Sequence, residues 1–266
     1  MGYFSCIEQE EHMKRTVKIL LIAVAVISII ACVLCCLYLY QYFRGNHLNK
    51  RIGDQMVTSA AVLNSDGQMR IGVDFDALTA ENDEIYAWIE VPGTNISYPV
   101  VQSAEDDLYY NSHAVDQSYF SGGSIYSQRY NKTDFSDPMT LLYGHNCRSS
   151  YTMFAPLNDF ADAEIFKASP YIYIYTPDTV YQYSIFAAYP HSNEHLLLCH
   201  DFASEADFTE YFGALSGDMI NANFRRELFP HYGDKVITLS TCYQQNRMQR
   251  YLVQGVLSAE YTVIKD

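Results

Sequence analysis

The hydrophobic pattern divides the chain into an apolar run near the N-terminus and a longer region of short strands. The run from Ile19 to Tyr40 contains no charged residue. As a helix it would be about 30 Å long, enough to cross the hydrocarbon core of a bilayer. It is longer than the apolar part of a cleavable signal peptide, and the Leu-Tyr-Leu-Tyr-Gln-Tyr that ends it is a poor cleavage site. The pattern therefore predicts an uncleaved membrane anchor over residues 19–43.

Charge does not orient this anchor. Basic residues flank it on both sides, at Lys14, Arg15 and Lys18 before it and at Arg44, Lys50 and Arg51 after it. The positive-inside rule places basic residues on the cytoplasmic side, so this distribution gives nearly a tie. The side of the membrane on which the rest of the chain lies stays open at this point.

After a polar segment at 44–73, predicted to be a stalk or a short helix, the chain changes to short runs rich in β-branched and aromatic residues. Gly, Pro, Asp or Asn bounds each run, as is typical of strands. Residues 171–175 alternate Tyr and Ile, and Pro177 and Asp178 place a turn before the next run, which predicts a hairpin. The predicted strands are 85–91, 96–101, 123–126, 139–143, 171–175, 180–186, 236–240 and 251–257.

One helix is predicted between these strands, over residues 204–220. Ser204 and Asp207 have the spacing of a capping box, with Asp where Glu or Gln is preferred. Phe208, Tyr211, Phe212 and Leu215 then follow at the spacing of one apolar helix face. Many short strands with one or two helices predict a mostly β domain over 74–266, a largely antiparallel barrel with helical insertions.

Composition excludes two classes of protein. Among 266 residues, 15% are aromatic, which argues against a disordered chain. The formal net charge is −14, and 17 Lys and Arg stand against 31 Asp and Glu. Such a surface does not neutralise phosphates, so no nucleic-acid partner is predicted.

Cysteine and histidine provide the candidate chemistry. Three cysteines lie in the large domain, at 147, 199 and 242, and an odd number leaves at least one thiol free. Cys242 ends a predicted strand, where a thiol is partly exposed as a nucleophile must be. His145 also follows a predicted strand, and Arg250 opens the last one, where its charge could stabilise an oxyanion. The alternative is an unremarkable Cys and His.

A metal site is not predicted. The stretch His-x3-His-x3-Cys-His at 191–200 has ligand-like spacing, but such ligands need a helix to share one face. Pro190, Ser192 and Asn193 disfavour a helix there, so a surface loop is predicted. The acidic residues 105–107 are interpreted as a solvated turn and not as a calcium site. No cofactor is predicted.

Four segments, taken in order, resemble the sortases, which are surface transpeptidases of Gram-positive-type bacteria. Thr-Leu-Ser-Thr-Cys at 238–242, followed by Arg250 at the head of an apolar strand, resembles the family signature. Leu-Tyr-Gly-His-Asn at 142–146 resembles its histidine motif, and residues 88–102 resemble the start of its barrel. Ser240 and the helix at 204–220 are most similar to class B. The resemblance covers residues 74–262.

The chain departs from the class B pattern in one place. The gap from Cys242 to Arg250 is eight positions, which is short, and Arg247 competes for the role of the arginine. Only Arg250 directly precedes the strand, so Arg250 is preferred.

The resemblance implies a sortase-like closed β-barrel with Cys242, His145 and Arg250 as catalytic residues. Cys242 would attack the carbonyl of Thr in a C-terminal sorting signal of Asn-Pro-x-Thr type, and His145 would transfer protons. Arg250 would hold the oxyanion or the substrate backbone. An amine would then resolve the thioacyl intermediate, and it would belong to a peptidoglycan cross-bridge, to its lipid-linked precursor or to a pilin Lys.

Three further residues are candidates for substrate binding. Ser240 and Thr241 flank the nucleophile and could line the groove, or could be simple strand residues. Tyr110 lies where class B relatives have a groove wall, and core packing is the alternative.

The resemblance also implies the topology: a cytoplasmic tail at 1–18, a single membrane pass through the lipid bilayer at 19–43, and residues 45–266 outside the cytoplasm. A class B transpeptidase is the favoured interpretation. The alternatives are a pilin-polymerising sortase and a non-catalytic anchored scaffold, and the intact Cys242, His145 and Arg250 argue against the scaffold.

Overall fold

The N-terminal part of the chain is helical. In this computed structural model, residues 2–56, 62–64, 67–215 and 219–264 are described. The chain divides into two units, Met1–Arg44 and Gly45–Asp266. Helix α1 spans Gly2–Met56 and runs through the predicted anchor without a break. Its segment Glu11–Tyr40 reaches a mean hydropathy of 3.3 and is, among the described residues, the one helix apolar and long enough to cross a membrane.

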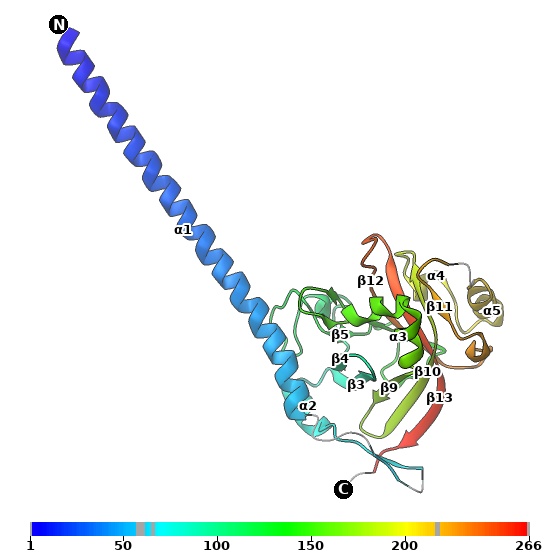
Figure 1. The fold of residues 1–266 in the computed structure, drawn as a ribbon. Coiled ribbons are helices and arrows are strands. Elements are labelled where there is room, and N and C mark those ends of the chain that lie inside the picture. The colour runs from blue at the N-terminus through cyan, green and yellow to red at the C-terminus, as the bar shows by residue number, and fades with distance from the viewer. Residues whose placement is uncertain (1, 57–61, 65–66, 216–218, 265–266) are drawn as a thin grey trace. The chain divides into compact units, whose positions relative to one another are not determined.

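The second unit is a closed β-barrel (Figure 1). Eight strands form the ring in the order β10-β13-β12-β6-β5-β4-β3-β9, and β9 closes it by pairing with β10. The pairs β4–β5 and β6–β12 are parallel, and the other pairs are antiparallel. The ring strands are β3 Ile85–Val91, β4 Ile96–Val101, β5 Ile125–Tyr126, β6 Met139–Tyr143, β9 Tyr171–Tyr175, β10 Thr179–His191, β12 Val236–Cys242 and β13 Arg250–Thr262. The predicted mostly β closed barrel is confirmed.

Two of the strands are longer than the sequence predicts. β10 and β13 each have 13 residues and pair along their whole length. Their register shifts between Gln182 and Tyr183 and again between Ile185 and Ala187. Such bulges bend and twist a strand, which lets a long pair follow the curvature of a barrel. Local patterning does not reveal this length, because the bulges interrupt the alternation of buried and exposed residues.

Short elements connect the barrel strands. The helices are α2 Phe75–Glu81, α3 Ala163–Ala168, α4 Leu196–Cys199 and α5 Glu205–Gly213, with 3-10 turns η1 Tyr109–Asn111, η2 Ala155–Ala161 and η3 Arg226–Leu228. The remaining strands are β1 Val62–Leu63, β2 Met69–Arg70, β7 Asn146–Cys147, β8 Thr152–Met153 and β11 Asn223–Phe224, the last of which extends the sheet beyond β10. Part of the predicted stalk is therefore β-structured. Met69 bridges to Val263 near the end of the chain, while Ala60 and Ala61 lie outside the described residues.

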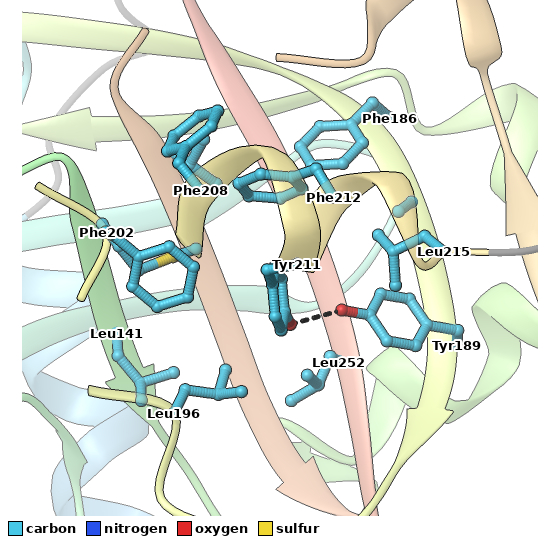
Figure 2. Packing of buried hydrophobic residues seen from close by; sticks show 13 residues of the cluster. Leu141, Phe186, Tyr189, Leu196, Phe202, Phe208, Tyr211, Phe212, Leu215 and Leu252 are labelled. Carbon is cyan, nitrogen blue, oxygen red and sulfur yellow. Dashed lines mark hydrogen bonds between the residues drawn. The ribbon is translucent and has the colours of Figure 1, made fainter. Parts of the chain in front are cut away.

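Helix α5 covers one outer face of the barrel. Ser204 caps it by accepting a hydrogen bond from the backbone of Asp207, as predicted. Its apolar residues pack with Phe186 of β10 and Leu252 of β13 (Figure 2). The helix ends at Gly213, earlier than the predicted 220, and glycine is a poor helix residue because its backbone entropy opposes the helix.

Phe212→Ala is expected to destabilise the barrel unit by roughly 3–5 kcal/mol, since a buried Phe ring leaves a cavity when truncated. Phe212 is 4% exposed and contacts the rings of Phe186 and Phe208. Urea unfolding of the full chain in detergent can be followed by the fluorescence of Trp88, the single tryptophan, which is buried in β3. The control is Leu198→Ala on the exposed side of α4, which should change stability by less than about 0.5 kcal/mol. Equal stability of the two variants would contradict the packing described here.

Candidate functional site

A cavity of about 310 Å³ opens at the ends of β6, β12 and β13. Its floor comes from alternate residues of three adjacent strands: Leu141 and Tyr143, Ser240 and Cys242, and Arg250 and Leu252. Because side chains alternate across a sheet, residues two apart on each strand share this face. Leu141 and Leu252 also belong to the cluster under α5, so the cavity and α5 lie on the same face of the sheet.

The strand register places the thiol beside the guanidinium. Cys242, the last residue of β12, pairs directly with Arg250, the first residue of β13. Arg250 Nη1 donates a hydrogen bond to Cys242 Sγ at 3.2 Å. Arg250 Nε donates to Asn193 Oδ1 at 2.7 Å. A half-buried thiol thus lies against a permanent positive charge.

Two asparagines hold the backbone at Cys242. The side-chain amides of Asn146 and Asn158 both donate to the Cys242 carbonyl, at 3.0 and 3.2 Å. Asn158 Oδ1 also accepts from the backbone N–H of Gln244 at 2.8 Å. Asn158 is buried, so these bonds are shielded from water, and they fix the point at which β12 passes into the loop.

His145 enters the cavity from the end of β6. The backbone N–H of Gly144 donates to the Ser240 carbonyl at 3.1 Å, which continues the parallel pairing up to the histidine. A Cβ at position 144 would lie 2.7 Å from Cδ2 of the buried Phe154 ring, so this close approach favours glycine. His145 Nε2 lies 2.7 Å from the Asn111 carbonyl oxygen. A carbonyl only accepts, so Nε2 carries a proton and Nδ1 is the nitrogen with a free lone pair in the neutral ring.

Two tyrosines and a histidine of the cavity are uncharged at pH 7. Tyr126 and Tyr143 stack with ring centroids 5.4 Å apart. Burial raises the pKa of Tyr126 to about 12, although Arg250 opposes the shift, and burial also raises the pKa of Tyr143. Burial lowers the pKa of His195 below its usual value, which keeps that imidazole uncharged.

The structure brings together four of the six predicted site residues. Cys242, His145, Arg250 and Ser240 all line the cavity, from the two strands β12 and β13 and from the loop that follows β6. Arg247, the competing arginine, is exposed in the turn between β12 and β13, outside the residues that line the cavity.

Thr241 and Tyr110 are not in the cavity lining. Thr241 is 1% exposed and lies on the opposite face of β12, with Ile237 and Leu239. Tyr110 is also 1% exposed, and its hydroxyl donates to Glu84 while accepting from Asn82. Thr241 is therefore a buried strand residue and Tyr110 is packed in the core, which were the alternatives given for them.

Sequence reasoning missed the segment after β10. Asn193, Glu194 and His195 line the cavity together with His191, the last residue of β10, although a surface loop was predicted there. His195 Nε2 lies 2.6 Å from Gln128 Oε1, which ties the segment to the other side of the cavity. Within the described residues, no three His, Cys, Asp or Glu side chains are grouped to hold a metal ion. Local sequence does not predict that this segment lines the cavity, because its position is set by the register of β10 against β13.

Comparison with known proteins identifies the family. The family model described as "Sortase domain" matches residues 89–258, well over half of the chain, and this range includes every residue that lines the cavity. The chain belongs to the sortase family.

The relatives of this sortase are of class B. A curated relative, Sortase B of Listeria monocytogenes, is 29% identical over 203 residues, covering 74% of this chain and 78% of the relative. A crystal structure from Bacillus anthracis described as similar to sortase B matches with a TM-score of 0.66 at 26% identity, covering 81% of this chain and 96% of that one. A Streptococcus pyogenes class B sortase involved in pilus biogenesis matches with a TM-score of 0.59 at 27% identity, over 70% of this chain and 99% of that one.

These matches confirm the predicted family, class and enzyme type. Sortases are cysteine transpeptidases that act on surface proteins with sorting signals and on amine acceptors of the cell wall. The apolar segment Glu11–Tyr40 agrees with such a cell-surface role, because its length and composition suit a membrane anchor.

Proposed function

We propose that this sortase cleaves a C-terminal sorting signal of Asn-Pro-x-Thr type after Thr and transfers the protein to an amine of the cell wall. The observation that carries the proposal is the contact of Arg250 Nη1 with Cys242 Sγ in the cavity that His145 also lines. A nucleophile, a proton carrier and a fixed cation in one cavity are the groups that acyl transfer through a thioester needs.

In the first half of the reaction, Cys242 Sγ attacks the carbonyl carbon of Thr and a tetrahedral oxyanion forms. The thiol proton passes to His145, and Nδ1 is the nitrogen that receives it because Nε2 already carries a hydrogen bonded to Asn111. His145 then protonates the leaving amine as the C–N bond breaks, and a thioester remains on Cys242. Arg250 stabilises the oxyanion through its charge and its free N–H groups.

In the second half, an acceptor amine attacks the thioester. His145 takes a proton from this amine, the C–S bond breaks, and the Cys242 thiolate is released and reprotonated. Ser240 lines the cavity beside the nucleophile and contributes a small polar surface to the bound signal.

The acceptor is proposed to be a peptidoglycan cross-bridge or its lipid-linked precursor. A pilin Lys is the second candidate, favoured by the likeness to the Streptococcus pyogenes class B sortase involved in pilus biogenesis. Both acceptors are primary amines, and the same chemistry at Cys242 serves either.

The proposed arrangement in the cell follows from the substrates. Sorting signals and cell-wall amines are reached outside the cytoplasm, so residues 45–266, including the catalytic barrel at 74–266, are placed there. Residues 19–43 then form the single membrane pass and residues 1–18 the cytoplasmic tail, with 44–73 as the connecting segment. Exposure of every side chain from residue 11 to 40 supports a lipid-facing helix.

The test uses the full chain in detergent or vesicles with peptides of Asn-Pro-x-Thr and Leu-Pro-x-Thr type. Each peptide is incubated with no amine, with a glycine-based amine, or with a Lys peptide, and products are identified by mass. Cleavage confined to the Asn-Pro peptides, a thioacyl adduct on Cys242 and diversion of the product to one amine are expected. Cleavage of neither peptide set with no adduct on Cys242 would overturn the proposal.

A further inference from the structure

We propose that Asn193 is a positioning residue that sets the orientation of the Arg250 guanidinium over the Cys242 thiol. This inference rests on the proposed role of Arg250 at the oxyanion. It concerns a residue outside the segments that resemble the family motifs, on the segment between β10 and α4.

The geometry gives Arg250 two fixed contacts. Its backbone lies between two strands, paired with His191 of β10 on one side and with Cys242 of β12 on the other. Its side chain donates from Nε to Asn193 Oδ1 at 2.7 Å and from Nη1 to Cys242 Sγ at 3.2 Å. A guanidinium is planar, so two contacts at different nitrogens fix its plane, whereas one contact leaves it free to rotate. The remaining N–H groups then have a defined direction.

Asn193 is itself held at the point where it meets Arg250. It lies two residues after β10, whose last residue His191 is fixed by pairing with Arg250. On its other side, His195 Nε2 lies 2.6 Å from Gln128 Oε1 and its ring stands edge-on to Tyr130, with centroids 5.0 Å apart. The segment is therefore tied at both ends, although Asn193 itself is exposed.

Glu194 adds a third attachment to the segment. Its Oε1 lies 3.5 Å from His191 Nε2 and 3.6 Å from His200 Nε2, so the carboxylate sits between the two imidazoles. The acceptor oxygen of Asn193 is thus in place before a substrate arrives, which lowers the reorganisation needed at the transition state.

An amide suits this position chemically. Asn193 Oδ1 accepts one N–H of Arg250 without bringing a charge of its own, whereas a carboxylate would offset part of the positive charge that the oxyanion needs. The hydrogen bond therefore orients the guanidinium and leaves its charge available to the substrate.

The test is a double-mutant cycle in the full chain, with kcat and KM measured on an Asn-Pro-x-Thr peptide. Asn193→Ala alone is expected to lower kcat about 10- to 100-fold with less than about a twofold change in KM, because a misplaced catalytic group slows the chemical step. In the Arg250→Ala background, the same substitution is expected to lower kcat less than about twofold, since no guanidinium remains to be oriented.

A structural role would behave differently. If Asn193→Ala lowers kcat equally in both backgrounds, it acts through the segment or the substrate and the inference is overturned. It is also overturned if Asn193→Ala leaves kcat unchanged while Arg250→Ala lowers it. Leu198→Ala on the exposed side of α4 is the control for the same stretch of chain, and unfolding followed by Trp88 fluorescence checks that each variant is folded. Failure of the proposed function is separate, because it shows as no thioacyl adduct on Cys242 in the unmutated protein.

Discussion

Cys242→Ala is expected to abolish turnover of an Asn-Pro-x-Thr peptide, with a loss on the order of 10⁴- to 10⁶-fold in kcat. Alanine removes the sulfur that forms the thioester, and Arg250 and His145 have no other nucleophile to assist. The loss should appear in peptide cleavage and in the thioacyl adduct detected by mass. Folding should be unaffected, because the Cys242 backbone keeps its hydrogen bonds from Asn146 and Asn158.

The other two thiols of the barrel unit are matched controls. Cys199 is exposed and lines a different cavity, beside His200 and Asp207. Cys147 is half-buried, and burial raises the pKa of its thiol, which lowers the fraction of thiolate at pH 7. Cys199→Ala and Cys147→Ala are expected to keep kcat within about threefold of the unmutated protein. Loss of cleavage in Cys199→Ala with full activity in Cys242→Ala would show that the nucleophile is assigned to the wrong residue.

Arg250→Ala is expected to lower kcat about 10²- to 10³-fold with a smaller effect on KM, because oxyanion stabilisation is felt mainly in the transition state. Arg250→Lys keeps the charge but replaces the planar fork by a single ammonium, so it should recover only part of the activity. Steady-state kinetics of peptide cleavage and the rate of adduct formation in a single turnover measure both effects.

Arg247→Ala is the matched control, since it removes the same charge from the exposed turn that precedes β13. It is expected to leave kcat within about twofold of the unmutated protein. The reverse ranking of the two arginines, with Arg247→Ala the more damaging, would move the role of Arg250 to Arg247 and would make the contact with Cys242 Sγ irrelevant to the reaction.

The parts of the fold that the sequence predicts are those that depend on neighbouring residues. The apolar helix at 19–40, the alternation at 171–175 and the cap at Ser204 each depend on neighbouring positions in the chain, and each is present in the structure. The lengths of β10 and β13 are not visible in this way. Their bulges break the local alternation, and the two strands stabilise each other only once they pair.

The candidate site is likewise predicted in part from local sequence and determined in part only by contacts between distant segments. Cys242, His145 and Arg250 can be selected from the sequence because each stands where a strand begins or ends, inside a segment that resembles a family motif. The strand period of two also separates Ser240 from Thr241, since residues one apart on a strand point to opposite faces. Tyr110 carries no such signal, and the core position of its hydroxyl between Glu84 and Asn82 depends on contacts between distant segments.

Local patterns and motifs are enough to predict an apolar helix long enough to span a membrane, a mostly β domain and the groups for thiol acyl transfer. The tertiary structure alone decided which groups share a cavity. Pairing of Arg250 with both His191 and Cys242 brings Asn193 within hydrogen-bonding distance of the guanidinium, across 57 positions of sequence. The physical reason is that closure of the barrel sets the strand register, and closure is a property of all eight strands together.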